Sequence, residues 1–353
     1  MIFYLLKKEG CLGICFKQSL FERKLKLQIF FLLTENCNLN CSMCIRGRQQ
    51  GINMDIDQLQ KVLDKNDFSM HDIVITGGEP AIHNGYLEIV KRMADSAKSV
   101  TVTSNGTLDL KLEKLVDIDN LFFQISLDGD IKTHNQTRGE KAFERTWKTL
   151  ERMDALRLRY AVASVVSKKN QNDIFELLPK LEKLKNMEYW RVSYEMPFGN
   201  ASGIEDIMSA KEWNDFVDHL LACARLRLMV RKIFPFDLYE SRKVDLERVA
   251  ERKRSFNCGS GANKLYVYPD FKVYPCTCLT DFCIGHLDKQ LLQDILKGEE
   301  IKKFSNYKLQ EESECQGCKY KKFCNGGCIG MSYHYFGKLG MGDLRCPKLY
   351  KRK

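Results

Sequence analysis

The chain has 353 residues, more than one hydrophobic core usually accommodates, so we expect one large domain and a smaller one. The formal net charge of +10 comes from scattered Lys and Arg, which indicates solubility; an acidic peptide or nucleotide partner is the alternative, and no nucleic-acid partner is expected. The longest apolar run, residues 27–33, is too short for a membrane helix. The N-terminus begins with apolar residues and reaches its first lysines afterwards, whereas a secretory signal has its positive charges first. We therefore expect a cytoplasmic protein without membrane contact.

Six short runs with strand-like composition alternate with segments whose apolar residues recur at helical spacing. The expected strands cover residues 27–34, 72–76, 99–103, 121–127, 160–166 and 190–194. The expected helices between them cover residues 56–63, 87–94, 111–116, 142–156 and 174–184. This alternation indicates an α/β protein with a parallel sheet and right-handed crossovers. Six units favour a partial (β/α)6 TIM-like barrel, with its ligand site at the carboxyl ends of the strands.

The pattern changes after Pro197. A helical stretch over residues 210–228 leads to a Cys-rich segment, which begins at Cys258 and has too few apolar residues for a core of its own. Such a segment is typical of a small domain that is held together by metal. We therefore predict an N-terminal extension, a barrel, a linking helical region and a Cys-rich domain, at residues 1–24, 25–205, 206–250 and 251–353.

The chain contains 15 cysteines, and because the cytosol keeps thiols reduced, their number indicates metal binding rather than disulfides. Cys37, Cys41 and Cys44 follow the first expected strand on one short loop. Three thiolates can ligate three irons of a four-iron cluster, which leaves the fourth iron open to a cofactor or substrate. Zinc is the alternative, although it prefers four ligands, or fewer with His or Glu close by.

The Cys-x3-Cys-x2-Cys spacing is followed, one strand later, by Gly77-Gly78-Glu79-Pro80. The two motifs in this order resemble the radical SAM superfamily. The resemblance implies that Gly-Gly-Glu-Pro receives the amino group of S-adenosylmethionine (SAM), because glycines let backbone carbonyls approach and Glu79 supplies a compensating charge. It also implies that a reduced 4Fe-4S cluster cleaves SAM to methionine and a 5′-deoxyadenosyl radical, which abstracts a hydrogen atom from the substrate.

Residues at the ends of the following strands are further candidates for SAM contact. By the same resemblance, Asn105, Ser126 and Asp128 contact the methionine carboxylate and the ribose hydroxyls, and Val165 lines the adenine. The alternative for the polar residues is turn formation, since Asn-Gly and Asp-Gly form turns on their own account. The alternative for Val165 is simple core packing.

Seven cysteines from Cys258 onward resemble the SPASM extension of radical SAM enzymes, which usually holds two auxiliary 4Fe-4S clusters. The resemblance assigns the first cluster to Cys258, Cys276 and Cys328, with Cys278, Cys283 or a substrate group as the fourth ligand. It assigns the second cluster to Cys315, Cys318, Cys324 and Cys346. The alternative is a four-thiolate zinc site formed by Cys315, Cys318, Cys324 and Cys328. Three other cysteines fit neither group and are expected to be buried packing residues: Cys11, Cys15 and Cys223.

The reaction is narrowed by Thr277, which occupies the position where anaerobic sulfatase maturases carry an Asp base. A Thr hydroxyl cannot act as a base near neutral pH, so sulfatase maturation is disfavoured. A non-catalytic electron-transfer role is also disfavoured, because Gly-Gly-Glu-Pro would then have no purpose. The leading hypothesis is an oxidoreductase or maturase that cross-links or epimerises a ribosomally made peptide. The alternative is dehydrogenation or rearrangement of a small molecule such as a sugar or an antibiotic precursor.

No catalytic acid or base can be assigned from the sequence. Residues 196–201 resemble the stretch that closes the sixth strand in this superfamily, and Arg191 and Glu195 before it face either the barrel interior or the surface. The resemblance implies an electron donor such as flavodoxin or ferredoxin. Because only 36 residues precede Cys37, we expect any leader of a peptide substrate to be bound elsewhere on the chain or by a separate protein.

Overall fold

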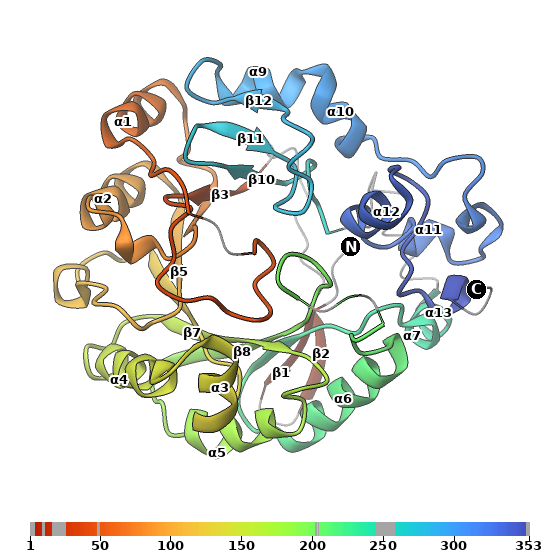
Figure 1. Ribbon diagram of the computed structural model, residues 1–353, viewed down its shortest axis with the longest axis horizontal. Helices are drawn as coiled ribbons and strands as arrows, with labels where there is room; N and C mark the ends of the chain where they lie inside the picture. The colour runs from red at the N-terminus through yellow and green to blue at the C-terminus, as the bar shows by residue number, and fades with distance from the viewer. Residues whose placement is uncertain are drawn as a thin grey trace.

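One 12-stranded sheet organises the computed structural model, which describes residues 4–8, 11–15, 26–47, 50–201, 203, 205–243 and 258–350. The strand order is β12-β11-β10-β3-β4-β5-β6-β7-β8-β9-β1-β2. The six predicted strands form its centre, parallel and in chain order: β3 (Gln28–Leu32), β4 (Asp72–Thr76), β5 (Ser99–Ser104), β6 (Leu121–Ser126), β7 (Tyr160–Val166) and β8 (Met187–Tyr194). Figure 1 shows helices outside these strands. The predicted α/β partial barrel is confirmed.

The crossover helices form where apolar residues recur at helical spacing. They are α1 (Ile56–Lys65), α2 (Tyr86–Ser96) and α4 (Ala142–Ala155). Helix α1 begins at Asp55, whose carboxylate accepts the Gln58 N–H at 2.7 Å, and its apolar face is buried against the sheet. The sheet and these helices share one core, in which Tyr160, Trp190 and Phe123 are fully buried.

Three predicted helices differ from the observed ones. The segment predicted at 111–116 forms only a short 3₁₀ helix, Leu112–Lys114. The segment predicted at 174–184 begins as a 3₁₀ helix, Asp173–Leu177, and continues as the single turn α5 (Leu178–Leu181), which has Pro179 near its start because Pro lacks an N–H to donate. Helix α6 (Ala210–Cys223) is shorter than the predicted 210–228, since its end leads into a strand, β9 (Leu228–Val230).

Helix α3 (Ile131–Arg138) is absent from the sequence prediction. It has little apolar periodicity, because most of its residues are polar. It is defined by its ends: the Asp130 carboxylate accepts the Thr133 N–H at 2.8 Å, and Gly139 follows the last turn with a positive φ of 125°. This helix brings Arg138 to the mouth of the barrel, where it pairs with Asp128.

The parallel sheet extends by one short strand on each side of the six. Strand β9 pairs with β8, and β10 (Lys264–Val267) pairs with β3, where Tyr266 stacks on Phe30 with ring centroids 4.5 Å apart. Antiparallel strands follow on both edges: β11 (Lys272–Tyr274), β12 (Gly285–His286), β1 (Tyr4–Lys8) and β2 (Cys11–Cys15). The Cys-rich segment is therefore continuous with the barrel sheet through β10.

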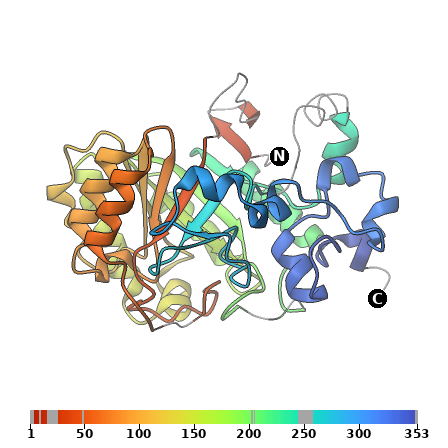
Figure 2. The same cartoon turned by 90° about the horizontal axis from the view of Figure 1, so that it is seen from above.

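The rest of the Cys-rich segment consists of short helices and loops beside the barrel (Figure 2). They are α9 (Leu292–Lys297), α10 (Glu299–Ser305), α11 (Lys321–Cys324), α12 (Ile329–Phe336) and α13 (Pro347–Tyr350). Tyr320 and Phe323 pack on Tyr239 of α7 (Phe236–Ser241) in a small separate core. Among the described residues, no helix has the length and apolarity to cross a bilayer. The four-part division predicted from the sequence stays a prediction.

Candidate active site and metal centres

The loop after β3 surrounds a cavity of about 180 Å³ at the carboxyl ends of the strands. Cys37, Cys41 and Cys44 all line this cavity, together with Gly77 and Gly78. The loop is a series of tight turns, in which the Cys44 N–H donates to the Cys41 carbonyl at 3.2 Å. The structure thus brings the three predicted cluster ligands together and places the predicted SAM-binding glycines beside them.

These three thiols suit a four-iron cluster. Burial raises the pKa of Cys41 to about 11 and also raises the pKa of Cys37, so both are thiols until a metal replaces their protons. Among the described residues, no three His, Cys, Asp or Glu side chains converge closely enough to hold a single metal ion. A four-iron cluster binds each thiolate through a different iron, so its ligands lie farther apart than those of one ion.

Gly78 has no room for a side chain. A Cβ atom added to Gly78 would lie 2.0 Å from the carbonyl oxygen of Asn36, the residue just before Cys37. Two backbone hydrogen bonds hold this contact: Gly78 N–H donates to the Thr34 carbonyl at 2.8 Å, and Glu79 N–H donates to the Asn36 carbonyl at 2.9 Å. The Gly-Gly-Glu-Pro segment therefore holds the base of the cysteine loop as well as lining the cavity.

The Glu79 carboxylate is buried and holds the end of β5. The Ser104 hydroxyl and the Asn105 N–H each donate to it at 2.8 Å, and the Ala81 N–H donates at 3.3 Å. Burial raises the pKa of Glu79, although these donors favour its ionised form. The Asn105 amide in turn donates to Asn38 of the cysteine loop at 2.9 Å. Glu79 and Asn105 thus connect the ends of β4 and β5 to the cysteine loop.

Asp128 is completely buried at the end of β6, and both of its carboxylate oxygens have partners. One accepts the Val165 N–H at 2.8 Å, and the other accepts the Arg138 guanidinium. Val165 and Ser126 are half-buried at neighbouring strand ends, and the structure gives the Ser126 hydroxyl no hydrogen bond among the described residues. Of the predicted ribose contacts, Ser126 is therefore free to meet a ligand, whereas Asp128 organises the strand ends.

Arg138 is a site residue that the sequence prediction missed. Burial lowers its pKa, but the charges of Asp128 and Cys41 outweigh this effect and raise it, so the side chain is a fixed cation beside the cysteine loop. The carbonyl of Thr137 also accepts the Ser42 N–H at 3.1 Å, which ties α3 to that loop. The sequence signal was the pair of helix ends, Asp130 and Gly139, rather than apolar spacing.

The stretch predicted to close the sixth strand holds the cysteine loop from its other side. The Asn200 N–H donates to the Cys44 carbonyl at 2.9 Å, and its side-chain amide donates to the Cys41 carbonyl at 3.1 Å. Gly199, with a φ of 66°, lies so close that an added Cβ would be 2.3 Å from the Cys44 carbonyl oxygen. Arg191 and Glu195 precede this stretch. The Arg191 guanidinium donates a hydrogen bond to the Gln124 side chain of β6 at 3.3 Å, and Glu195 is buried.

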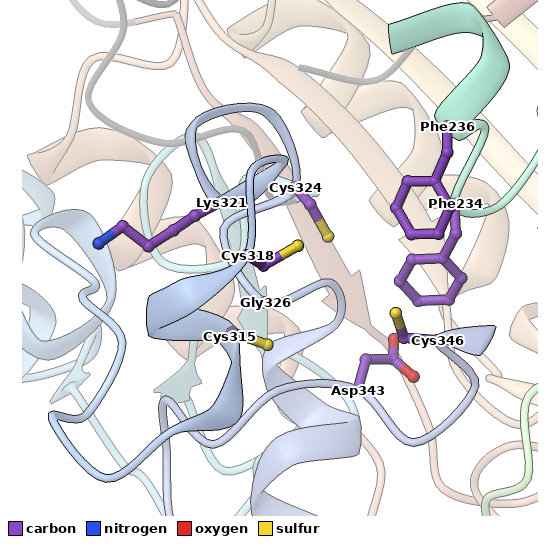
Figure 3. Close-up of a pocket in the computed structure, with 9 residues that line it drawn as sticks. All are labelled: Phe234, Phe236, Cys315, Cys318, Lys321, Cys324, Gly326, Asp343 and Cys346. Atoms are coloured by element: carbon purple, nitrogen blue, oxygen red, sulfur yellow. The ribbon is translucent and has the colours of Figure 1, made fainter. Parts of the chain in front are cut away.

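The four cysteines assigned to the second auxiliary cluster line one pocket (Figure 3). They are Cys315, Cys318, Cys324 and Cys346. Phe234, Phe236 and Asp343 line the same pocket. Burial raises the pKa of Cys324 to about 12, and it also raises the pKa of Cys315 and Cys346. Cys328 does not line this pocket, so the structure separates it from the set that the zinc alternative would need.

The cysteines assigned to the first auxiliary cluster do not line this pocket. Cys258 lies 2.9 Å from the Ser260 hydroxyl, and the Cys278 N–H is 3.5 Å from the Cys276 sulfur. Burial raises the pKa of Tyr266 on β10, and charges on Cys276, Cys258 and Cys278 raise it further. Burial also raises the pKa of Cys328 to about 12, where the charges of Cys258 and Cys276 act in the same direction.

A buried ion pair contacts both auxiliary sites. Asp343 and Arg345 are almost fully buried and lie 2.6 Å apart, and the Cys328 N–H donates to Asp343 at 3.0 Å. Asp343 also lines the pocket of the second site. Arg345 reaches the barrel, where its guanidinium lies 5.3 Å from the ring centre of Tyr194 on β8. One ion pair therefore connects both sites to the barrel.

One prediction about the remaining cysteines is wrong. Cys223 is exposed, because it is the last residue of α6 and lies off its buried face. Cys11 and Cys15 lie on β2, whose side chains fall outside the described residues.

Comparison with known proteins agrees with this geometry. The chain matches the radical SAM superfamily over residues 31–196 and the SPASM iron–sulfur cluster-binding domain over residues 258–319. It is 26% identical to the antilisterial bacteriocin subtilosin biosynthesis protein AlbA of Bacillus subtilis, over 87% of this chain and 68% of that protein. It is 25% identical to the sporulation killing factor maturation protein SkfB of the same species, over 84% of this chain and 68% of that protein.

Two further comparisons concern a heme-forming enzyme and a crystal structure. An AdoMet-dependent heme synthase of Methanosarcina barkeri is 24% identical, over 85% of this chain and 90% of that protein. The crystal structure of Streptococcus suis SuiB bound to S-adenosylmethionine has the same fold, with a TM-score of 0.75 and 16% identity over 92% of this chain and 77% of that one.

A barrel with a three-cysteine loop, joined to an iron–sulfur cluster-binding domain, defines an enzyme that uses SAM and a 4Fe-4S cluster. The chain belongs to the radical SAM superfamily, in the branch that carries a SPASM domain with auxiliary clusters.

The contact at Gly78 gives a first prediction. We expect Gly78→Ala to displace the cysteine loop, because its Cβ would meet the Asn36 carbonyl, and to reduce 5′-deoxyadenosine formation by at least about 10-fold, the effect of ~1.4 kcal/mol on the barrier. The assay is product formation after anaerobic reduction with SAM. Gly203→Ala is the matched control, since an added Cβ there meets nothing within 4 Å. Equal rates for the two variants would contradict the prediction.

A second prediction concerns the buried pair of Arg138 and Asp128. Arg138→Met leaves a buried carboxylate without its cation, and we expect the free energy of unfolding to fall by about 3–5 kcal/mol. Denaturant titration of the purified protein measures it. Arg159→Met is the control, because its ion pair with Glu188 is largely exposed and is worth at most about 1 kcal/mol. A loss at Arg138 no larger than at Arg159 would refute the argument.

A third prediction tests the second auxiliary site. Cys318→Ala should lower the iron content of the reconstituted protein below about twelve atoms per chain, by about one iron if a three-iron cluster is left and by about four if the whole cluster is lost, because one four-iron cluster loses a ligand. Iron is measured colorimetrically against protein concentration. Cys223→Ala, at an exposed cysteine outside every proposed cluster, should leave the iron content unchanged. Retention of all the iron in Cys318→Ala would remove this cysteine from the ligand set.

Proposed function

We propose that the protein modifies a ribosomally made peptide, by forming a cross-link or by changing the configuration of a residue. The observation that carries the proposal is the likeness, over most of the chain, to two proteins whose names describe bacteriocin biosynthesis and killing factor maturation. The cavity beside Cys37, Cys41 and Cys44 supports it, because a peptide segment can enter a site that is open at the barrel mouth.

The proposed roles of the chain's own residues follow from the geometry. Cys37, Cys41 and Cys44 would hold the 4Fe-4S cluster, and Gly77, Gly78 and the Glu79 region would receive SAM. When bound, cluster and SAM supply a radical that abstracts hydrogen from the substrate. Arg138 would keep a positive charge beside the cluster thiolates, which stabilises their ionised form.

A small-molecule substrate is the second candidate. The likeness to the AdoMet-dependent heme synthase favours it, since that protein is covered over almost its whole length. The two candidates differ in what must reach the cavity, a flexible chain or a compact molecule. Thr277 still argues against sulfatase maturation: its hydroxyl lies 3.5 Å from the Tyr268 hydroxyl, and neither group is a base near neutral pH.

The decisive experiment incubates the reconstituted, reduced enzyme with SAM and precursor peptides encoded beside its gene. We expect 5′-deoxyadenosine together with a modified peptide. Loss of about two hydrogen masses indicates a cross-link, and uptake of deuterium from D₂O at one residue indicates epimerisation. Cys44→Ala is the inactive control. Turnover with a heme precursor, and none with any peptide, would replace this proposal by the small-molecule alternative.

A further inference from the structure

The first auxiliary site holds one more thiol than its three assigned ligands. Cys276 and Cys278 are separated only by Thr277 and follow β11, and the Cys278 N–H is 3.5 Å from the Cys276 sulfur. Both cysteines are partly buried. A cysteine two positions from a ligand is therefore already inside the site.

Cys278 also lies beside the ligand that comes from the far end of the segment. Gly330, in the first turn of α12, is the common neighbour: a Cβ added there would lie 3.3 Å from the Cys278 Cβ and 3.7 Å from the Cys328 sulfur. A side chain at Gly330 would crowd the Cys278 Cβ, and its absence leaves Cys278 and Cys328 on either side of the same point. Cys278 is thus close to Cys276 and Cys328, two of the three assigned ligands.

Cys283, the other candidate, has different neighbours. Its sulfur lies 3.4 Å from the carbonyl oxygen of Gly285, to which it donates, and 3.8 Å from the His286 ring. Gly285 and His286 form β12, which pairs with β11 on the edge of the sheet. The thiol of Cys283 is therefore engaged with the sheet edge.

We propose that Cys278 is the fourth protein ligand of the first auxiliary cluster, so that this cluster is closed by Cys258, Cys276, Cys278 and Cys328. Binding requires the thiol to lose its proton and the sulfur to donate an electron pair to iron, without oxidation or reduction of either. A closed cluster has no iron free for a substrate sulfur. It can transfer electrons, and the substrate then meets only the SAM site. The inference rests on the SPASM cluster assignment and is independent of the peptide substrate.

The test uses the full chain with Cys37, Cys41 and Cys44 replaced by Ala, so that only the auxiliary clusters remain. This parent protein should bind about eight irons and keep them after mild ferricyanide oxidation. Adding Cys278→Ala should open one iron, which oxidation then removes, giving the electron paramagnetic resonance signal of a three-iron cluster and a loss of about one iron in eight. Adding Cys283→Ala, the matched control, should leave the parent's iron and spectrum unchanged.

Three other results overturn the proposal, and a fourth is decided by a second variant. A three-iron signal in the parent would mean that the cluster is open despite Cys278, and the same signal only in Cys283→Ala would assign the ligand to Cys283. An unchanged spectrum in Cys278→Ala would remove Cys278 from the site. If Cys278→Ala loses the whole cluster, the variant Cys278→Ser is measured instead. Restored iron with an altered spectrum supports ligation by residue 278. Restored iron with the parent's spectrum, or loss of both clusters, overturns the proposal.

Discussion

The site depends on the close approach of three backbone segments to the loop of Cys37, Cys41 and Cys44. This loop has few packed side chains of its own. It accepts hydrogen bonds from Glu79 and Asn200, and it donates one to the end of α3. The contacts at Gly78 and Gly199 are possible only because neither residue has a side chain. Loops of different strands therefore fix the positions of the thiols before any iron is bound, which reduces the ordering that cluster binding requires.

Two buried ion pairs act on the thiols in the same way. Asp128 fixes Arg138 beside Cys41, and Asp343 fixes Arg345 beside Cys328. A cluster with several thiolates brings negative charge into a site with little water, and a cation that is held in place offsets part of that charge without having to reorganise. Each carboxylate also accepts a backbone N–H, from Val165 or from Cys328, so the pair links elements as well as balancing charge.

The sequence predicted most of the barrel, because its six strands are apolar runs separated by amphipathic helices and each could be recognised on its own. Strands β9 and β10 escaped prediction because they have only three and four residues and exist through pairing with β8 and β3. Helix α3 escaped because its stability comes from its ends and from tertiary contacts, and with it Arg138 was missed. Spacing alone could group the C-terminal cysteines by resemblance, but it could not choose between Cys278 and Cys283, since that choice depends on where β12 places the second of them.

The pairing of β10 with β3 has a consequence for how the chain folds. It joins residues that are far apart in sequence, Gln28 with Lys264, so β3 is synthesised long before its partner. Until β10 arrives, one edge of the parallel sheet presents unpaired backbone groups beside the buried side chains of β3, such as Ile29 and Phe31. Pairing over such a distance is slow, and an unpaired edge is where chains associate wrongly. The Cys-rich segment therefore also covers an edge of the barrel sheet that would otherwise be open to association with another chain.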